Sequence, residues 1–325
     1  MKENEKLYIL PNILNIFAES LGTKVRNRRI EIPDEFGKGY CAGFVFNEHI
    51  QMLFLNYELK ENLIIENPLI DESQRMILFK FQHIISQPKP SQPTQLPRDI
   101  PSVLIGTSRM NTDSIIPIDT KTAAINIEVD ANYLKELFEL SEKSPVLQSL
   151  LENSQPLLFE QMVYPSLQII VDEIVEEVVS QSVNQAFEIF FLKIKAEELV
   201  CRLLMELEKR DEKRVYALNK QDLAAAYRVK KQMLEHLDTP PIIKELAIQA
   251  NMSPTKLKCI FKQIFGNSIF SYYQTFRIRE AARLLKEENL SVSDAGYKMG
   301  FSNLSHFSRV FEEHIGMKPK QYSRS

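Results

Sequence analysis

Short apolar or alternating runs, separated by turn-forming residues, fill the first 130 residues of the chain. Alternation of this kind predicts β-strands, and several short strands bounded by turns are typical of a sandwich or a small barrel. Residues 51–57 are apolar on both faces, which suits a hydrophobic or aromatic ligand and equally a plain core. One short helix is expected first, at 13–21. Strands are expected at 40–46, 51–57, 63–65, 76–81, 103–107 and 123–129.

From Ala131 onward the apolar residues recur at helical spacing. The longest of these helices has an apolar face that Phe187, Phe190 and Phe191 broaden at its start. Two arrangements fit this face. It packs wholly inside its own domain, or it packs against both the sheet and a second subunit. The helices are expected at 131–140, at 146–151, from an N-cap at Ser166, and at about 186–209.

The charge-rich residues 208–221 predict a linker between two domains. The segment before them, 1–207, is expected to be a sensing or dimerisation domain, β-rich over 1–130 and helical over 131–207. A Pro-rich stretch, 88–101, predicts a surface loop or arm within it. Residues 222–325 are expected to form the second, all-helical domain, which opens with a helix at 222–236.

One apolar pattern occurs twice in the second domain, and each copy predicts a short helix, a tight turn and a longer helix. In the first copy Ala247 is small enough for the two helices to cross closely, and Asn251 tolerates a left-handed turn. Ser253 then stands at an N-cap, with Pro254 at the first helical position. Gly266 ends the helix.

The second copy follows the same order, with Gly296 at the crossing, Gly300 in the turn and Gly316 at the end. Ser302 or Asn303 is the expected N-cap. Ala247 and Gly296, at the two crossings, are 49 positions apart, whereas the core residues Phe261 and Phe311 are 50 apart. One extra residue is therefore expected near the start of the second recognition helix. A connecting helix at 270–285 would fix the spacing of the two motifs. Two recognition helices about 34 Å apart can enter successive major grooves of DNA.

Composition adds a charge asymmetry to this plan. Residues 239–325 hold 13 Lys and Arg against 7 Asp and Glu, a net charge of +6. Residues 1–207 hold 19 against 30, a net charge of −11. A basic tail on an acidic body indicates that the tail meets a polyanion, although charge can also be merely uneven.

Cellular context follows from what the chain lacks. No apolar run of about 18 residues predicts a membrane span, and the polar N-terminus does not predict a signal peptide. Three widely spaced cysteines, 41, 201 and 259, fit a reducing cytoplasm.

Catalytic and cofactor patterns are absent from the body. His49 and His83 are its only histidines, and no His-x-His pair, Gly-rich phosphate loop or nucleophile elbow accompanies them. We therefore expect no metal, no cofactor and no enzymatic site.

The run from Arg277 to Leu285, the run from Ser291 to Phe311 and the closing run from Gly316 to Tyr322 resemble the DNA-binding domain of AraC/XylS-type transcription regulators. The resemblance covers about 222–325. It implies contacts to double-stranded DNA from residues early in each recognition helix. On this sequence the candidates are Ser253, Thr255, Lys256, Lys258 and Lys262 in the first motif and Ser302, Asn303, Leu304, Ser305 and Arg309 in the second.

Three of these candidates have plainer interpretations. Lys258 and Lys262 can bind phosphates without reading sequence, and Arg309 can pair with Glu312 or Glu313 on its own helix. Cys259 stands where many members of the family carry an arginine that reaches a base. The first helix is therefore expected mainly to hold the DNA backbone, and the second to read more of the bases.

The resemblance also implies an N-terminal cupin-like barrel that binds a small-molecule effector or dimerises, and RNA polymerase as a partner. The expected function is a cytoplasmic, homodimeric transcription regulator, for instance an activator. The alternatives are an architectural DNA-binding protein whose body only dimerises, and an enzyme fused to a DNA-binding tail.

Overall fold

The computed structural model describes residues 10–61, 63–64, 75–84, 101–108, 115–116, 121–138 and 143–324. These residues divide into two compact units, one ending at Leu218 and one beginning at Asn219. Most of the Pro-rich stretch 88–101 lies outside the described residues. Among the described helices, none combines the length and the apolar character that crossing a bilayer requires.

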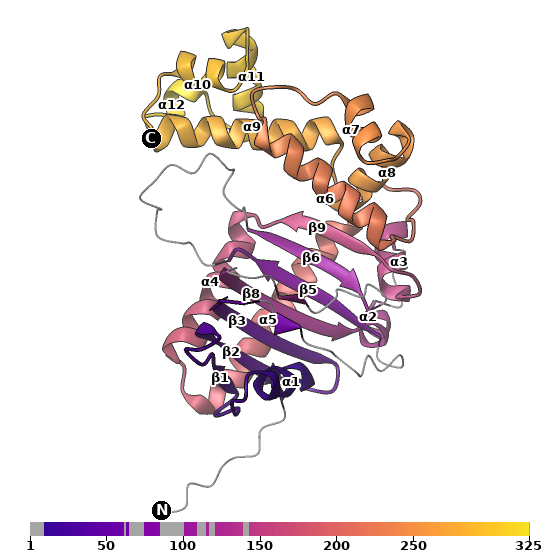
Figure 1. Cartoon of the computed structure of the whole chain (residues 1–325), viewed down its shortest axis with the longest axis vertical. Coiled ribbons are helices and arrows are strands. Elements are labelled where there is room, and N and C mark those ends of the chain that lie inside the picture. Colours follow the sequence, from indigo (N-terminus) through magenta and orange to yellow (C-terminus); the bar gives the residue numbers. More distant parts are fainter. Residues whose placement is uncertain are drawn as a thin grey trace, which may run out of the picture. The chain divides into compact units, whose positions relative to one another are not determined.

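The first unit is built on an antiparallel sheet of seven strands (Figure 1). Its order is β1-β2-β3-β8-β5-β6-β9, so the described strands leave an open sheet with β1 and β9 at its edges. The predicted β-rich region followed by helices is confirmed. The strands are β1 (Arg29–Glu31), β2 (Gly37–Val45), β3 (Ile50–Leu59), β5 (Met76–Gln82), β6 (Ser102–Thr107), β8 (Lys121–Asp130) and β9 (Leu158–Met162), with β4 (Leu63–Ile64) and β7 (Ile115–Ile116) forming a separate pair.

Alternation along each strand gives the sheet two different faces. One face carries Phe54, Phe79, Phe81 and Ile127, all fully buried in one core with the helices that follow the sheet. On the other face α1 (Asn12–Ser20) covers β2 and β3, where Phe17 packs on Tyr57. The rest of this second face carries polar side chains at its centre.

The helices of the first unit are α2 (Ala131–Leu137), α3 (Pro145–Glu152), α4 (Pro165–Ser180) and α5 (Gln185–Glu208). α4 and α5 lie against the sheet, and the predicted stripe of α5 is buried at Leu192, Leu199 and Leu203 (Figure 1). The predicted N-cap at Ser166 is wrong. Tyr164 is the N-cap, because Pro165, with no N–H and a fixed φ, suits the first helical position.

Residues 209–218, which lie in the predicted linker, are held against the first unit. The Arg210 guanidinium lies 5.2 Å from the centre of the Phe159 ring. Leu218 is buried, and its N–H donates to the carbonyl oxygen of Pro156 at 2.8 Å. The chain therefore leaves the first unit only at Asn219, which is already the N-cap of the next helix.

The second unit consists of helices around an aromatic core. Phe261, Phe265 and Tyr272 contact one another, as do Phe307 and Phe311. Its helices are α6 (Lys220–Glu235), α7 (Ile243–Gln249), α8 (Pro254–Phe265), α9 (Ile269–Lys286), α10 (Val292–Lys298), α11 (Leu304–Ile315) and α12 (Pro319–Tyr322).

Candidate nucleic-acid interface

The two predicted motifs have the same turn. In the first, Met252 N–H donates to the carbonyl oxygen of Ala247 at 2.9 Å, and Asn251 has a φ of +53°. In the second, Phe301 N–H donates to the carbonyl oxygen of Gly296 at 3.0 Å, and Gly300 has a φ of +71°. Asn and Gly are the residues that reach this left-handed conformation most easily, so the local sequence determines both turns.

Close helix crossing in the second motif depends on the absence of a side chain at Gly296. A Cβ there would lie 2.9 Å from Leu304 Cδ2 and 3.0 Å from Phe307 Cδ1. The predicted small crossing position is therefore confirmed. At the start of α7, Ile242 is the N-cap and is exposed, so it does not contribute to the inner face of the motif.

The two longer helices, α8 and α11, have matching ends. The Ser253 hydroxyl accepts from Lys256 N–H at 3.2 Å, and Asn303 Oδ1 accepts from Ser305 N–H at 2.9 Å and His306 N–H at 3.1 Å. Each helix has 12 residues and stops at a glycine in the left-handed conformation, Gly266 or Gly316. The extra residue of the second motif therefore lies in its turn, before Asn303, and not within the recognition helix.

The candidate residues of the first motif project from one side of α8. Thr255, Lys256 and Lys258 are exposed, while Leu257 and Phe261 on the opposite side are buried. Lys256 is not free, because its Nζ lies 2.8 Å from Asp222 Oδ1 on α6. Asp222 is mostly buried and also accepts from Asn219 Nδ2 at 3.0 Å, so this pair ties α8 to the start of α6.

The candidates of the second motif have more varied surroundings. Ser302 and Ser305 are exposed, and the side chain of Asn303 is used in the N-cap. Leu304 is half-buried against Gly296. The Arg309 side chain is 70% exposed, and its Nε lies 3.9 Å from Glu313, at the outer limit of an ion pair. This weak contact leaves the guanidinium available to a ligand.

A polar junction around α9 joins the two motifs. Arg277 Nε donates to the carbonyl oxygen of Met299 at 2.6 Å, and its guanidinium lies 3.7 Å from the centre of the Phe301 ring. The Tyr273 hydroxyl donates to the carbonyl oxygen of Leu237 at 2.8 Å. Burial lowers the pKa of Arg277 and raises that of Tyr273, so both groups are partly removed from water.

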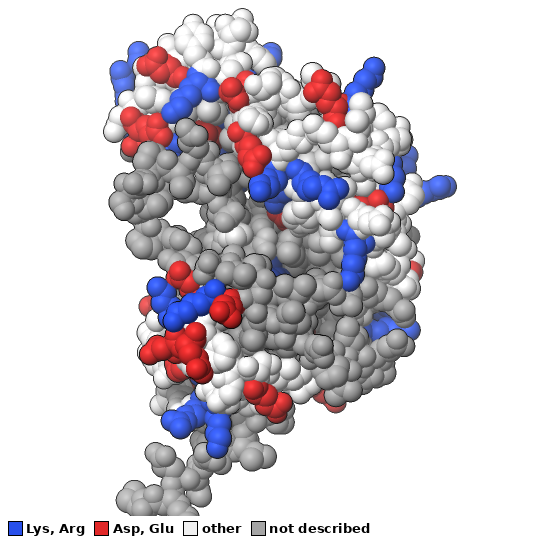
Figure 2. Space-filling view, in the orientation of Figure 1, with Lys and Arg blue, Asp and Glu red and all other residues white. Residues whose placement is uncertain are grey.

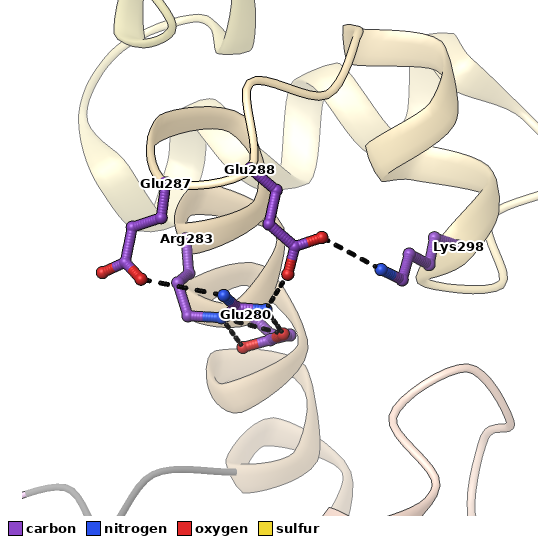
Figure 3. Close-up of polar contacts among 5 residues, drawn as sticks. All are labelled: Glu280, Arg283, Glu287, Glu288 and Lys298. Carbon is purple, nitrogen blue, oxygen red and sulfur yellow. Dashed lines mark hydrogen bonds and ion pairs between the residues drawn. The ribbon is translucent and has the colours of Figure 1, made fainter. Parts of the chain in front are cut away.

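An ion-pair cluster fixes the first helix of the second motif to the end of α9 (Figure 3). Arg283 lies 2.7 Å from Glu280 and 2.7 Å from Glu288, and Lys298 of α10 lies 3.2 Å from Glu288. The hydrogen bond from Arg283 lowers the pKa of Glu288, which keeps this carboxylate ionised.

Three features of this region were missed in the sequence. The contact of Asp222 with a candidate lysine was not predicted, and neither was the hydrogen bond of Arg277 to Met299. Ile248 and Tyr297, 78% and 57% exposed, hold equivalent positions of α7 and α10. Their 49-residue offset is the signal in the sequence that could have identified them.

Basic and acidic side chains are interspersed on the face in Figure 2, so the net positive charge of the region does not form one continuous surface there.

Two helix-turn-helix motifs with matched turns and caps, joined by the 18-residue helix α9, define a double helix-turn-helix domain. Residues 246–325 match a family model described as a helix-turn-helix domain. The C-terminal unit contains an AraC-type helix-turn-helix domain, as the sequence resemblance predicted.

Two curated relatives each match about a quarter of this chain. The chain is 31% identical to the HTH-type transcriptional regulator GbdR of Pseudomonas aeruginosa over 88 residues, 27% of this chain and 24% of that protein. It is 31% identical to the arabinose operon regulatory protein of Escherichia coli over 80 residues, 25% of this chain and 27% of that protein. The match therefore spans about a quarter of each relative's length.

A solved structure of ToxT from Vibrio cholerae covers 85% of this chain and 98% of its own, with 14% identity and a TM-score of 0.32. A TM-score this low does not establish a shared fold over the whole chain.

Proposed function

We propose that the protein is a transcription regulator that binds double-stranded DNA through α8 and α11, one in each of two successive major grooves. The repeated turn and cap geometry of the two motifs carries this proposal, because it presents two equivalent helices from one rigid connector. The relatives that match the domain are named as regulators of transcription, which supports the same function.

The two helices divide the work. On α8, Lys258 and Lys262 provide positive charge for phosphates. The thiol of Cys259 cannot pair with a base edge. On α11, Ser305 and Arg309 are exposed and can reach base edges, while Asn303 acts through the cap that holds the helix start. Ser253 has the same capping role on α8.

Arg309→Ala tests the base contact. The full-length protein is first used to select its preferred duplex from a random pool, and binding to it is then measured. Loss of a guanidinium that reads a base should cost about 1–3 kcal/mol and relax sequence preference at one position. Lys231→Ala removes one exposed charge from α6 and should leave that preference unchanged. Unaltered affinity and preference in Arg309→Ala would remove Arg309 from the interface.

Lys258→Ala gives the complementary result. A phosphate contact contributes to all sequences alike, so this variant should weaken binding uniformly and reduce the salt dependence of the affinity by about one counterion. A changed sequence preference would instead make Lys258 a base-reading residue. A wild-type protein that selects no duplex would contradict the proposed function itself.

We propose control of the domain by the first unit, through a homodimer and a small-molecule effector. The outer side of α5 carries Phe187 and Phe190, 62% and 64% exposed, and Met205, 57% exposed. Ile194 and Cys201 continue this stripe, and the spacings from Phe187 to Met205 are three, four, seven and four residues. Such spacing is typical of helix pairing, so a second copy of the chain is the proposed partner.

Action on RNA polymerase in the cytoplasm follows from the proposed role in transcription. The three cysteines are free thiols, which suits a reducing compartment.

A further inference from the structure

A polar row crosses the centre of the sheet on the face opposite the main core. Register places Leu53 of β3 beside Asn126 of β8, Asn126 beside Lys80 of β5, and Lys80 beside Leu104 of β6. The neighbours of Lys80 and Asn126 along their own strands, such as Phe79 and Ile127, point into the main core. Lys80 and Asn126 therefore share the second face, next to the part that α1 covers.

Lys80 has no partner for its charge within the described parts of the first unit. No hydrogen bond or ion pair of its ammonium group exists among the residues that the structure describes, and burial lowers its pKa. An unpaired amine in such surroundings is costly to keep. Lys38 on β2 contrasts with it: that side chain is 74% exposed and pairs with Glu58 at 3.2 Å.

The described polar groups next to Lys80 do not pair with its ammonium group. Asn126 Oδ1 is buried and accepts no hydrogen bond within the described parts of the chain. Glu128, two residues along β8, accepts a hydrogen bond from Gln51 and is not paired with Lys80. Its pKa is raised by burial, which further weakens it as a counter-ion.

An edge-protecting role does not explain this lysine. Lysines on edge strands prevent sheets from pairing with other chains. β5 lies inside the sheet, bonded to β8 on one side and β6 on the other. A charge kept at the centre of a sheet, with no partner among the described residues, points to a partner that binds there.

We infer that Lys80 and Asn126 bind a small aliphatic carboxylate that carries a hydroxyl or amino group next to its acid group. The ammonium group of Lys80 pairs with the carboxylate, and Asn126 Oδ1 accepts from the neighbouring hydroxyl or amine. Leu53 and Leu104, on either side of the pair, contact the aliphatic part. This inference deepens the proposed effector control and rests on it, since the bound carboxylate would be the effector.

Thermal unfolding of the full-length protein tests the site with four probes. Leucine and 2-hydroxy-4-methylvalerate carry both the acid and the donor. The compound 4-methylvalerate lacks the donor, and 2-hydroxy-4-methylvaleramide lacks the charge. One or both of the first two should raise the melting temperature by several degrees at saturation. Which of the two does so distinguishes an amino acid from a hydroxy acid.

Lys80→Met keeps the length of the side chain and removes the charge. Without ligand it should melt at a higher temperature than the wild type, because a half-buried charge with no described partner is lost. Its dissociation constant for the stabilising probe should rise at least tenfold. Lys38→Met is the matched control and should bind the probe as the wild type does.

The inference is overturned if neither leucine nor 2-hydroxy-4-methylvalerate stabilises the wild type, if the uncharged amide stabilises it as much, or if Lys80→Met is stabilised equally. It is also overturned if Lys80→Met melts at a lower temperature without ligand, since Lys80 would then have a structural partner. Binding of Lys80→Met to the selected duplex without ligand is measured in parallel. Failure of the wild type to bind DNA would contradict the proposed function, whether or not the four probes stabilise the protein.

Discussion

Gly300 meets two separate demands at one position. Its φ of +71° lies in the left-handed region, and a Cβ would lie 1.8 Å from the carbonyl oxygen of Asp238. Gly316 has a similar φ of +83°, but its surroundings are open, with nothing within 4 Å of a Cβ. Substitutions at the two glycines can therefore separate the free-energy cost of a strained backbone conformation from the cost of a steric clash.

Gly300→Ala should destabilise the C-terminal unit by about 2–4 kcal/mol, because backbone strain and a clash with backbone atoms add together. Gly316→Ala should cost about 1 kcal/mol from conformation alone. Urea unfolding followed by circular dichroism gives both values. Equal losses in the two variants would show that Asp238 moves aside without cost.

The contact between α6 and α8 has a consequence for binding at the scale of elements. The Asp222 carboxylate holds Lys256 at 2.8 Å, on the side of α8 that carries the candidate DNA contacts. A phosphate group must therefore compete with this carboxylate for the lysine. The end of the first unit, Leu218, lies four residues before Asp222 in the chain, so the pair is also close to the connection between the two units.

Asp222→Asn should raise the affinity for the selected duplex about three- to tenfold, or ~0.7–1.4 kcal/mol, since it frees Lys256 and removes a negative charge near the phosphates. The amide still accepts a hydrogen bond from Asn219. Titrations at two salt concentrations should give a steeper salt dependence than in the wild type. Glu235→Gln removes an equal charge at the opposite end of the same helix and is the control. An unchanged or weaker affinity in Asp222→Asn would contradict the proposed competition.

At the scale of the whole molecule, one chain already holds two recognition helices. A homodimer through α5 would hold four and could bind two copies of a site. Dimerisation would then add affinity through effective concentration and would not be needed for reading one site.

Phe190→Lys places a charge on the exposed stripe of α5 and should make the protein monomeric in sedimentation. Its affinity for a duplex with one site should stay within about twofold of the wild type, and its affinity for a duplex with two sites should fall by tenfold or more. Glu176→Lys changes an exposed charge on α4, away from this stripe, and is the control. A Phe190→Lys protein that remains dimeric would exclude this stripe as the interface.

Local chemistry explains why the second unit was predicted well. The turns at Asn251 and Gly300, the cap at Ser253 and the stops at Gly266 and Gly316 each depend on residues close together in the chain. Such features can be read from a short stretch of sequence, because φ preferences and N-caps act within a few residues.

Contacts between distant residues were the part that sequence could not supply. Arg277 and Met299 are 22 positions apart, Lys256 and Asp222 are 34, and Tyr273 and Leu237 are 36. β9 was missed for a related reason. Its five residues lie between helices, and only pairing with β6 makes them a strand.

The junction at Gly300 also sets an order of events during synthesis. The connection that precedes the first motif, at Leu237 and Asp238, is completed by Tyr273, Gly300 and their neighbours, which the ribosome makes later. The first motif therefore leaves the ribosome with part of its support missing. A chain that stopped before Met299 would keep α8 but lose the turn that closes against Asp238. Such a fragment should be bound by chaperones or degraded. Folded protein in the cell would therefore contain both recognition helices.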